Sequence, residues 1–496
     1  MAIKRYFATK DNTITNAYKS GLILRGTGSN MGASDILENF VIFGQVTSSA
    51  TVGTAEQSRV LIEFNMNEIL DDISQGLVPS SSVDYVLKMY NAPHAGTTPL
   101  SYSLDVAMVA ADWNEGRGLD MENYSDFGYS NWIQPKDAVN WNVTGADYFG
   151  DSDYIGSYFF SGGLEDLELN VNYAIDEWRS LNKSNYGFLV KNTDEVISGN
   201  LGTFYTKKFF GRTSEFVLKR PVIEARWDSS RADNRGSFLV SSSLASADNN
   251  LNIVYLYNSV RGQLQDIPYL NGGRLNLSLY EDLSGSPTGS ALELKNASNE
   301  TVTAITGGIL IENGIQRTGI YTASFATTSS LSLVHDVWFT SSDGGVTETQ
   351  YFTGTIRPEV LRAGGLLENK SYVTAITNLK TNYYVGEKPT LRVFTRNKNW
   401  SPNIYTVAST EVVPEIIEDS YYRLFRTVDN FEILPYSTGS NKYTKLSYDV
   451  SGNYFSLDTS YLESGYMYGI QFLYYVDGVY AEQPEIFKFR LDDEEK

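Results

Sequence analysis

Cysteine is absent from this chain of 496 residues, and histidine occurs only twice, as His94 and His335. Without cysteine the protein has no disulfide, no thiolate metal site and no cysteine nucleophile. Two histidines give little support to a zinc site built from imidazoles, or to a hydrolase that needs a histidine base. We therefore expect neither kind of catalytic centre.

Long apolar runs are also absent. The sequence has no stretch of roughly 18 apolar residues, the length that a membrane-spanning helix needs. Residues 1–11 lack the apolar centre of a secretory signal. We therefore expect no membrane partner, and we expect the protein to stay in the compartment where it is made.

Basic residues are fewer than acidic ones. The chain has 39 basic and 59 acidic residues, which gives a formal net charge of −20. A surface this acidic repels phosphate backbones and anionic membranes, so nucleic acid is not an expected partner. The simplest interpretation is a well-solvated surface, and calcium binding is the alternative.

The residues that are abundant favour β structure. The chain is 42% hydrophobic and 13% aromatic, with 35 Tyr and 41 Gly. Aromatic side chains suit half-buried pleated surfaces, and glycine supplies turns. The length predicts about two to four domains.

Residues 1–228 are predicted to form the first domain. Apolar residues alternate with polar ones in two segments, as in strands with one wet face. They are Val60, Ile62 and Phe64, and then Val83, Tyr85, Leu87 and Met89, with Asp84 and Lys88 between them. Apolar residues every three positions predict a short helix over Tyr173–Leu181. A last strand is expected within Arg220–Asp228.

A polar stretch, residues 229–236, marks a predicted linker. Beyond it, 237–362 and 370–496 are predicted to be a divergent repeat. Tyr321 precedes Phe339 by the same spacing as Tyr454 precedes Phe472, and a hairpin signal follows each pair, at residues 342–345 and at Asp477-Gly478. This pattern favours two immunoglobulin-like β-sandwiches.

An ordered set of motifs lies within residues 1–228. They are Asp11–Thr15, Trp113–Gly116, Val139–Asn142, Ala174–Trp178 and Asn185–Lys191. In this order they resemble the DNRLRE family, whose members are jelly-roll sandwiches similar to carbohydrate-binding modules. The resemblance covers roughly residues 8–228. The expected fold is therefore all-β, a jelly-roll-like sandwich followed by two immunoglobulin-like sandwiches.

Residues 117–138 form an insertion between two turns that the family places close together, and long inserted loops are often functional. Its aromatic residues, which alternate with Asp and Asn, are Tyr124, Phe127, Tyr129 and Trp132. They are the candidate binding residues, for glycan or for protein. Trp113, Trp141 and Trp178 are more typical of a sandwich core than of a sugar platform.

Other candidate sites are weaker. Asp151–Asp153 and Glu165-Asp166 offer oxygen ligands for a structural calcium ion, but they lack the pattern of a known calcium loop. No other cofactor is expected. The loop 26–32 lacks the lysine of a nucleotide-binding loop and is expected to be mobile. Arg396 and Trp400 form a basic–aromatic pair that we interpret as an interface.

Two further stretches, Lys219–Asp228 and Leu446–Tyr454, resemble virion structural proteins of tailed phages. The resemblance implies a non-enzymatic virion component, assembled in the host cytoplasm, whose partners are other virion proteins or copies of itself. It would sit at the neck, at the tail or on the capsid surface. A glycan-binding adhesin that contacts host polysaccharide is the alternative. A polysaccharide-degrading enzyme is a third hypothesis.

Overall fold

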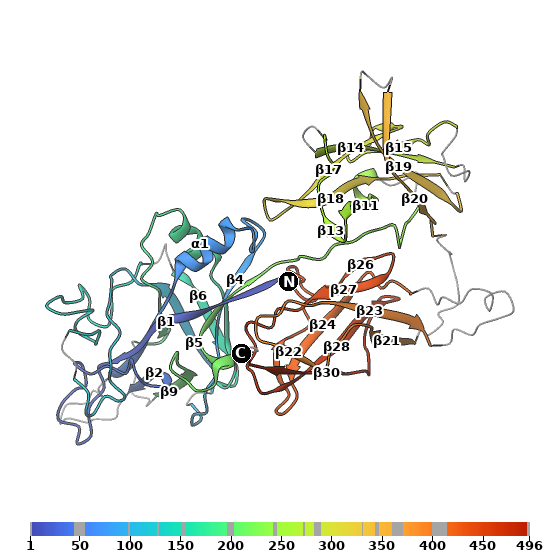
Figure 1. Ribbon diagram of the computed structural model, residues 1–496. Coiled ribbons are helices and arrows are strands. Elements are labelled where there is room, and N and C mark those ends of the chain that lie inside the picture. The colour runs from blue at the N-terminus through green and yellow to red at the C-terminus, as the bar shows by residue number, and fades with distance from the viewer. Residues whose placement is uncertain are drawn as a thin grey trace. The chain divides into compact units, whose positions relative to one another are not determined.

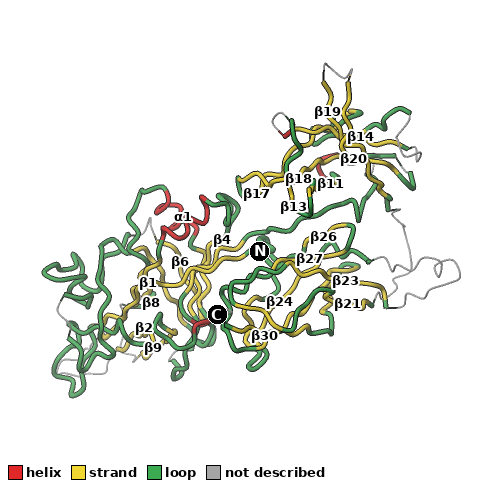
Figure 2. Tube along the Cα trace, in the orientation of Figure 1, coloured by secondary structure: helices red, strands yellow, loops and turns green. Residues whose placement is uncertain are grey.

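The computed structural model describes most of the chain (Figure 1). The described residues are 2–43, 55–97, 100–125, 128–150, 154–195, 203–241, 246–270, 273–281, 289–329, 331–342, 347–359, 371–398 and 414–493. Strands account for 46% of the described residues and helices for 6%, which confirms the predicted all-β class with sandwich-like sheets. Figure 2 shows how few helical turns, drawn red, accompany the strands. The domain limits 1–228, 237–362 and 370–496 stay predictions.

The chain divides into two compact units. One unit is Ile3–Trp227, and the other is Asp228–Lys496 together with Met1–Ala2. Among its described residues, the first unit contains ten strands in one hydrogen-bonded system. They are β1 (Ile3–Thr15), β2 (Ile36–Phe43), β3 (Ala55–Phe64), β4 (Asp84–Met89), β5 (Tyr102–Met108), β6 (Tyr154–Phe160), β7 (Leu167–Asn170), β8 (Phe188–Asn192), β9 (Thr203–Phe210) and β10 (Val222–Arg226).

Strand β1 belongs to two groups of strands. Its first half, from Ile3 to Phe7, pairs with β10, which leads on to β4 and β7. Its second half pairs with β3, which leads on to β8, β5 and β6. The register shifts between Ala8 and Lys10, where a bulge lets the strand bend from one group into the other. Strand β2 pairs with both β3 and β9 at the side of this path.

Two α-helices accompany these strands. Helix α2 (Asn172–Arg179) confirms the helix predicted around residues 173–181, and Ile175 and Trp178 are buried on its apolar face. Leu181 lies beyond the helix, 86% exposed, so it is not part of that face. Helix α1 (Met66–Ser74) was not predicted, although Asn65 caps it by accepting a hydrogen bond from Asn67 N. In the described part of the chain no helix is long and apolar enough to cross a membrane.

The expected wet face of β4 is wrong at Lys88, whose side chain is buried, while Asp84 is half-buried. Lys88 Nζ lies 2.5 Å from Glu168 Oε1, and Arg5 Nη2 lies 2.7 Å from Glu224 Oε1. Burial would raise the pKa of Glu224, but the charges of Arg5, Arg226 and Lys88 lower it to about 2. Strands from distant parts of the sequence thus share a buried layer of paired charges, which replaces water on this face.

The second unit begins with a six-stranded antiparallel sheet in the order β11-β18-β17-β14-β19-β20. These strands are β11 (Asn252–Tyr257), β14 (Arg274–Tyr280), β17 (Ile305–Glu312), β18 (Ile315–Phe325), β19 (Val334–Ser342) and β20 (Thr347–Ile356). Four short strands form two small ribbons: β12 (Ser259–Val260) with β13 (Gln263–Leu264), and β15 (Leu294–Lys295) with β16 (Thr301–Val302).

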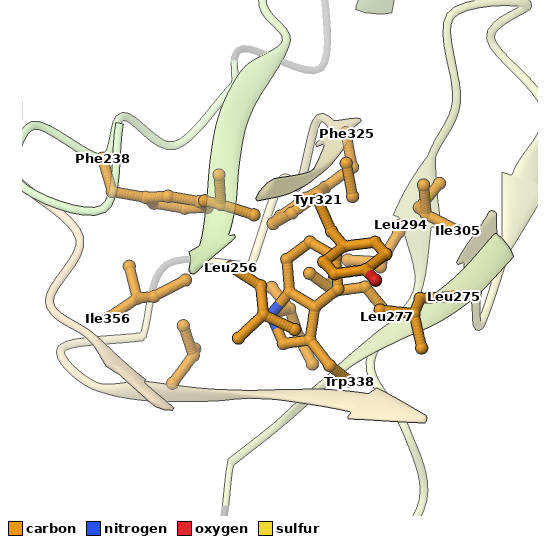
Figure 3. Close-up of a cluster of buried hydrophobic side chains, with 14 of the residues drawn as sticks. Phe238, Leu256, Leu275, Leu277, Leu294, Ile305, Tyr321, Phe325, Trp338 and Ile356 are labelled. Carbon is orange, nitrogen blue, oxygen red and sulfur yellow. The ribbon is translucent and has the colours of Figure 1, made fainter. Parts of the chain in front are cut away.

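One buried apolar cluster fills the interior of this sheet system. Its members come from β11, β14, β15 and β17–β20, and Figure 3 shows Tyr321 and Trp338 near its centre. Trp338 Nε1 donates to Asp336 Oδ2 at 2.9 Å, and Arg235 pairs with the same carboxylate at 2.7 Å. The two hydrogen bonds satisfy a carboxylate that would otherwise be costly to bury. Trp338 is therefore held both by packing and by its polar edge.

The last part of the second unit has two sheets, in the orders β21-β23-β27-β26 and β22-β30-β28-β24-β25, with β29 paired to β28. The strands of the first sheet are β21 (Tyr372–Ile376), β23 (Thr390–Asn397), β26 (Ser447–Asp449) and β27 (Gly452–Ser456). Those of the second are β22 (Asn382–Tyr384), β24 (Ser420–Arg426), β25 (Phe431–Leu434), β28 (Met467–Val476), β29 (Val479–Glu482) and β30 (Phe487–Asp492).

The predicted hairpin at Asp477-Gly478 is confirmed. Both residues have positive φ, +51° and +84°, and join β28 to β29, as in a tight hairpin turn. Of the first predicted turn, residues 342–345, only Ser342 is described, at the end of β19. The sheets do not repeat as predicted. The strands that carry Tyr321 and Phe339, β18 and β19, belong to one sheet, whereas β27 and β28, which carry the equivalently spaced Tyr454 and Phe472, belong to different sheets.

The stretch 229–236 is anchored by polar contacts within the second unit. Arg231 forms a bidentate pair with Glu312, with Nε–Oε1 and Nη2–Oε2 distances of 2.6 and 2.7 Å. The main-chain N of Arg231 donates to Ser447 Oγ at 2.9 Å. Both partners are far along the chain from Arg231, so local composition alone could not reveal these contacts.

Candidate functional site

The inserted segment 117–138 packs against a second loop, residues 16–35. Trp132 N donates a hydrogen bond to Thr27 O at 3.1 Å. We call residues 16–35 together with residues 117–147 the loop platform. The second range contains the insertion 117–138 and the turn that follows it. Figure 2 draws the platform almost entirely as loop. The question for function is what holds these loops in place and which side chains they present.

Two glycines allow the loops to approach closely. Gly118 N donates to Asn30 Oδ1 at 2.7 Å, and Ala33 N donates to Gly118 O at 3.0 Å. A Cβ atom on Gly116 would lie 1.9 Å from Asn30 Oδ1, and one on Gly118 would lie 1.9 Å from Asn30 O. Asn30 and Ser29 are fully buried. The expectation of a mobile loop at 26–32 is therefore wrong, because polar partners far along the chain fix it.

Asn12 ties both loops to strand β1. Its Nδ2 donates to Ser130 O at 2.9 Å and to Ser130 Oγ at 2.7 Å. Its Oδ1 accepts from Met31 N at 2.9 Å. Asn12 is fully buried, so these bonds are shielded from competing water. The asparagine of the Asp11–Thr15 motif thus anchors the platform, a role that was not assigned from the sequence.

Asp11, the neighbour of Asn12, is a buried carboxyl at the base of the platform. Its Oδ2 accepts from Arg212 N at 2.5 Å, and its main-chain N donates to Glu115 Oε1 at 2.9 Å. Arg212 Nη2 pairs with Glu115 Oε2 at 2.7 Å. Burial raises the pKa of Asp11 to about 7; the hydrogen bond from Arg212 N acts in the opposite direction, and the charge of Glu115 adds to the rise. Asp11 therefore titrates close to neutral pH.

The tryptophans of the motif set lie in the core, as expected for a scaffold. Trp113 and Trp141 belong to one buried cluster, and the ring of Trp178 lies against that of Phe188 in a tilted arrangement, with 5.0 Å between ring centroids. Their polar edges are partly used inside the protein: Trp113 Nε1 donates to Tyr186 O at 2.9 Å. These rings are therefore not presented to a ligand.

Trp132, a candidate binding residue, belongs to the same core cluster and is only 6% exposed. The Arg59 guanidinium lies over its ring at 5.2 Å and pairs with Glu195 at 2.7 Å. A Cβ atom on Gly145 would lie 2.8 Å from the ring, so the backbone closes tightly over it. The candidacy of Trp132 as a binding platform is thus corrected: its ring helps to hold the insertion on the sandwich.

The remaining aromatic candidates differ in placement. Tyr124 and Tyr129 are half-buried, and the Arg117 guanidinium lies 5.8 Å from the Tyr129 ring centre. Phe127 lies outside the described residues. Two of the four aromatic candidates are therefore available at least in part to a ligand or a partner.

Aliphatic side chains are more exposed on the platform than aromatic ones. The exposed members are Leu22, Ile23, Leu24, Leu119, Ile133, Val139 and Val143. Ile23 is 83% and Leu24 is 69% exposed. The aromatic residues of the insertion do not point to these aliphatic ones; the sequence signal that could have found them is the apolar run 21–24 inside a loop. Leu22, Ile23 and Leu24 are consecutive, and adjoining exposed aliphatic residues on an ordered loop are typical of protein contact surfaces.

The apolar tip at residues 19–24 is itself ordered. Lys19 N donates to Leu24 O at 2.7 Å, and Leu22 adopts a positive φ of +56° in this turn. The insertion supports the tip, since Ser20 N donates to Glu122 Oε1 at 2.5 Å and Lys19 Nζ donates to Glu122 O at 2.9 Å. The tip thus presents its apolar side chains in a defined arrangement.

The described carboxylates that were considered as calcium ligands accept hydrogen bonds from neighbouring loop residues instead. Glu165 accepts a hydrogen bond from Ser161 Oγ at 2.6 Å, and this bond is the main cause that lowers the pKa of Glu165 to about 2. Asp166 accepts from Asn91 N at 2.7 Å. Residues 151–153 lie outside the described residues. Within the described ranges, no group of three or more carboxylates and histidines is placed to hold a metal ion.

Only one residue of the predicted basic–aromatic pair, Arg396, is among the described residues. Arg396, in β23, is half-buried, and its Nη1 donates to Asn397 O at 3.3 Å. Trp400 lies outside the described residues. The stacking of Arg396 on Trp400 and their role as an interface therefore stay predictions.

Comparisons with known proteins add little to this geometry. No protein-family model matches the chain, and no curated protein matches it. Among solved structures, trypsin-activated alpha-2-macroglobulin from Escherichia coli aligns at 9% identity over 94% of this chain, with a TM-score of 0.14. Salmonella alpha-2-macroglobulin reacted with methylamine aligns at 8% identity over 99% of this chain, also with a TM-score of 0.14. The chain spans 24% and 28% of those two proteins.

Proposed function

We propose that the protein is a structural component of a tailed-phage virion that works through protein–protein contacts of the loop platform. It decorates or connects parts of the particle at the neck, the tail or the capsid surface. Its partners are other virion proteins or further copies of itself, and assembly takes place in the host cytoplasm. The observation that carries the proposal is the set of exposed aliphatic side chains on an ordered framework.

The energetics of the platform suit a protein partner. Burying one exposed leucine or isoleucine in an interface contributes about 1.5 to 3 kcal/mol. Ile23 and Leu24 stand on a turn that is already ordered by internal hydrogen bonds. Little conformational entropy is therefore lost when a partner covers them. A preordered apolar tip favours a lasting contact over a transient one.

The placement on a virion rests on sequence resemblance and on charge. Lys219–Asp228 and Leu446–Tyr454 resemble stretches of tailed-phage virion proteins. The net charge of −20 keeps the free subunit soluble in spite of its apolar tip. An acidic body with a small apolar contact surface is suited to a subunit that must stay dissolved until it assembles.

The glycan-binding adhesin has weaker support. Aromatic rings that stack on sugars have to face solvent, and Trp132 is buried under Arg59. Tyr124 and Tyr129 remain as half-buried candidates. The exposed surface of the platform is richer in aliphatic than in aromatic groups, which favours protein over sugar as its partner.

The test is to place charge on the tip and measure incorporation into particles. Ile23→Asp combined with Leu24→Asp removes two apolar contacts, worth about 3 to 6 kcal/mol, so binding should weaken at least 100-fold. We expect quantitative mass spectrometry of purified particles to show loss of the chain. The matched control is Leu181→Asp, an exposed leucine outside the platform, which should be incorporated normally.

Three results would contradict the proposal. The first is normal incorporation of the double variant while the control is also normal. The second is binding to host glycans that Tyr129→Ala abolishes, which would make the adhesin the main role. The third is release of sugar from host envelope by the purified protein, which would establish an enzyme.

A further inference from the structure

Lys207, in β9, is a fully buried cation whose hydrogen-bond partners are neutral. Its side chain has no exposed surface, and Phe160 and Phe209 enclose it, with ring centres 4.5 and 5.3 Å from Nζ. Nζ donates to Gly163 O at 3.0 Å and to Glu165 O at 2.6 Å. A buried ammonium is normally paired with a carboxylate. Each acceptor of Lys207 is instead an uncharged oxygen.

The third acceptor is the side-chain amide of Asn91. Lys207 Nζ lies 2.7 Å from Asn91 Oδ1. Asn91 lies two residues after the end of β4 and forms a bridge with Phe209, so its backbone runs beside the strand that carries Lys207. Asp166 Oδ1 accepts from Asn91 N at 2.7 Å and fixes the backbone of this residue. The amine and the amide are therefore held together by two neighbouring backbone segments.

Two more groups complete the cluster. His94 Nε2 lies 3.2 Å from Asn91 Oδ1 and 3.0 Å from Gly163 O, and in the tautomer that carries its proton on Nε2 it can donate to the amide oxygen. Glu165 Oε2 is buried and has no hydrogen-bond partner among the described residues, although Oε1 is bound by Ser161. The charge of Glu165 acts on the Lys207 amine, and an ionised carboxylate oxygen without a hydrogen-bond donor is a suitable proton acceptor.

The environment also favours an uncharged amine. Burial lowers the pKa of Lys207 to about 8, and the charges of Asp166 and Glu165 act in the opposite direction. A lysine amine is nucleophilic only when it has lost its proton, and desolvation is the usual way in which a protein promotes that loss. Near neutral pH a fraction of Lys207 is thus in the reactive form.

We propose that Lys207 and Asn91 join in an autocatalytic isopeptide bond with release of ammonia. Lys207 Nζ attacks Asn91 Cγ, and His94 Nε2 stabilises the oxygen of the tetrahedral intermediate by a hydrogen bond. Glu165 takes a proton from Nζ and passes it to Asn91 Nδ2. The Cγ–Nδ2 bond breaks, ammonia leaves, and a secondary amide remains between the two side chains. Atoms balance, and no oxidant or co-reactant is needed.

Such a bond fits a chain that has no cysteine. It would close a covalent ring between the segment after β4 and strand β9 and so restrict the unfolded chain, as a disulfide does. Unlike a disulfide, it does not depend on the redox state of its surroundings. The proposal is independent of what the loop platform binds, since Lys207 lies outside the platform.

The test is the intact mass of the full-length chain measured in denaturant. We expect the wild-type mass to be lower than the sequence mass by one ammonia, and Lys207→Met to have the full mass expected for its sequence. The matched control is Lys208→Met, the neighbouring residue, whose Nζ pairs with Glu38 near the surface. The control should keep the mass loss, and peptide mapping should find a branched peptide that joins residues 91 and 207.

A wild-type chain with the full sequence mass overturns the proposal. So does an ammonia loss that maps to another asparagine, or one that persists in Lys207→Met. These measurements need no folded variant, because the decisive reading is made on wild-type protein. Glu165→Gln tests the proton carrier: accumulation of chains without the bond supports the assigned role, and full cross-linking overturns it.

Discussion

Asp11 offers a quantitative test of how the loop platform is built. Its pKa rises from an ordinary value of 3.8 to about 7 in the folded protein. A rise of this size means that ionising Asp11 costs about 4 kcal/mol more in the folded than in the unfolded protein. Because the pKa is raised, the folded protein has about 4 kcal/mol of stability below about pH 4 that it loses as the pH rises through about 7.

The substitution Asp11→Asn removes the charge and keeps the shape, so the variant escapes this loss. We expect the difference in unfolding free energy between variant and wild type to grow by about 4 kcal/mol from about pH 4 to about pH 8.5. For a unit of this size that is a relative gain in Tm of about 10 °C. Differential scanning calorimetry at several pH values measures it directly.

A suitable control is Asp137→Asn, an exposed aspartate of the insertion. This variant makes the same chemical change at an exposed position of the same unit. The reasoning about Asp11 is refuted if the Asp11→Asn difference does not change with pH, because the carboxyl would then ionise without penalty and could not be buried beneath the platform.

Three further predictions concern other parts of the molecule. The pKa of Glu224 is lowered from 4.5 to about 2, so its charge contributes about 3 kcal/mol to stability above pH 4.5, and this contribution is lost as the pH falls towards 2. In an acid titration followed by circular dichroism, the Glu224→Gln variant should lose less stability than wild type over this range. Trp338→Ala empties the core of the second unit and should cost about 3 to 5 kcal/mol in urea unfolding; a cost below about 1 kcal/mol would contradict the packing in Figure 3. Gly118→Ala should push Asn30 away and speed hydrogen exchange around residues 117–125, while unchanged protection would show that the close approach is not needed.

Much of the β structure was predictable because it depends on local pattern. The alternation around Val60 and around Leu87 falls on β3 and β4, the helix around Trp178 is α2, and the Asp477-Gly478 turn joins β28 to β29. Each signal needs only neighbouring residues, since period and turn chemistry are properties of short segments.

What could not be predicted depends on residues that are distant in the sequence. The loop around Asn30 is ordered by Gly118, 88 positions away. Lys88 is buried because Glu168 and Glu224 reach it from other strands. Trp132 is buried because Arg59, on β3, covers its ring. Composition and spacing contain no direct signal of such pairings.

The central claim, that the loop platform contacts other virion proteins, is tested most directly by cross-linking mass spectrometry on purified particles. Lys19 and Lys136 lie on the two loops of the platform and serve as reporters. The account predicts cross-links from both lysines to a neighbouring virion subunit, lost in Ile23→Asp with Leu24→Asp. Particles that lack the chain, or that hold it with both lysines free of cross-links to any subunit, would contradict it.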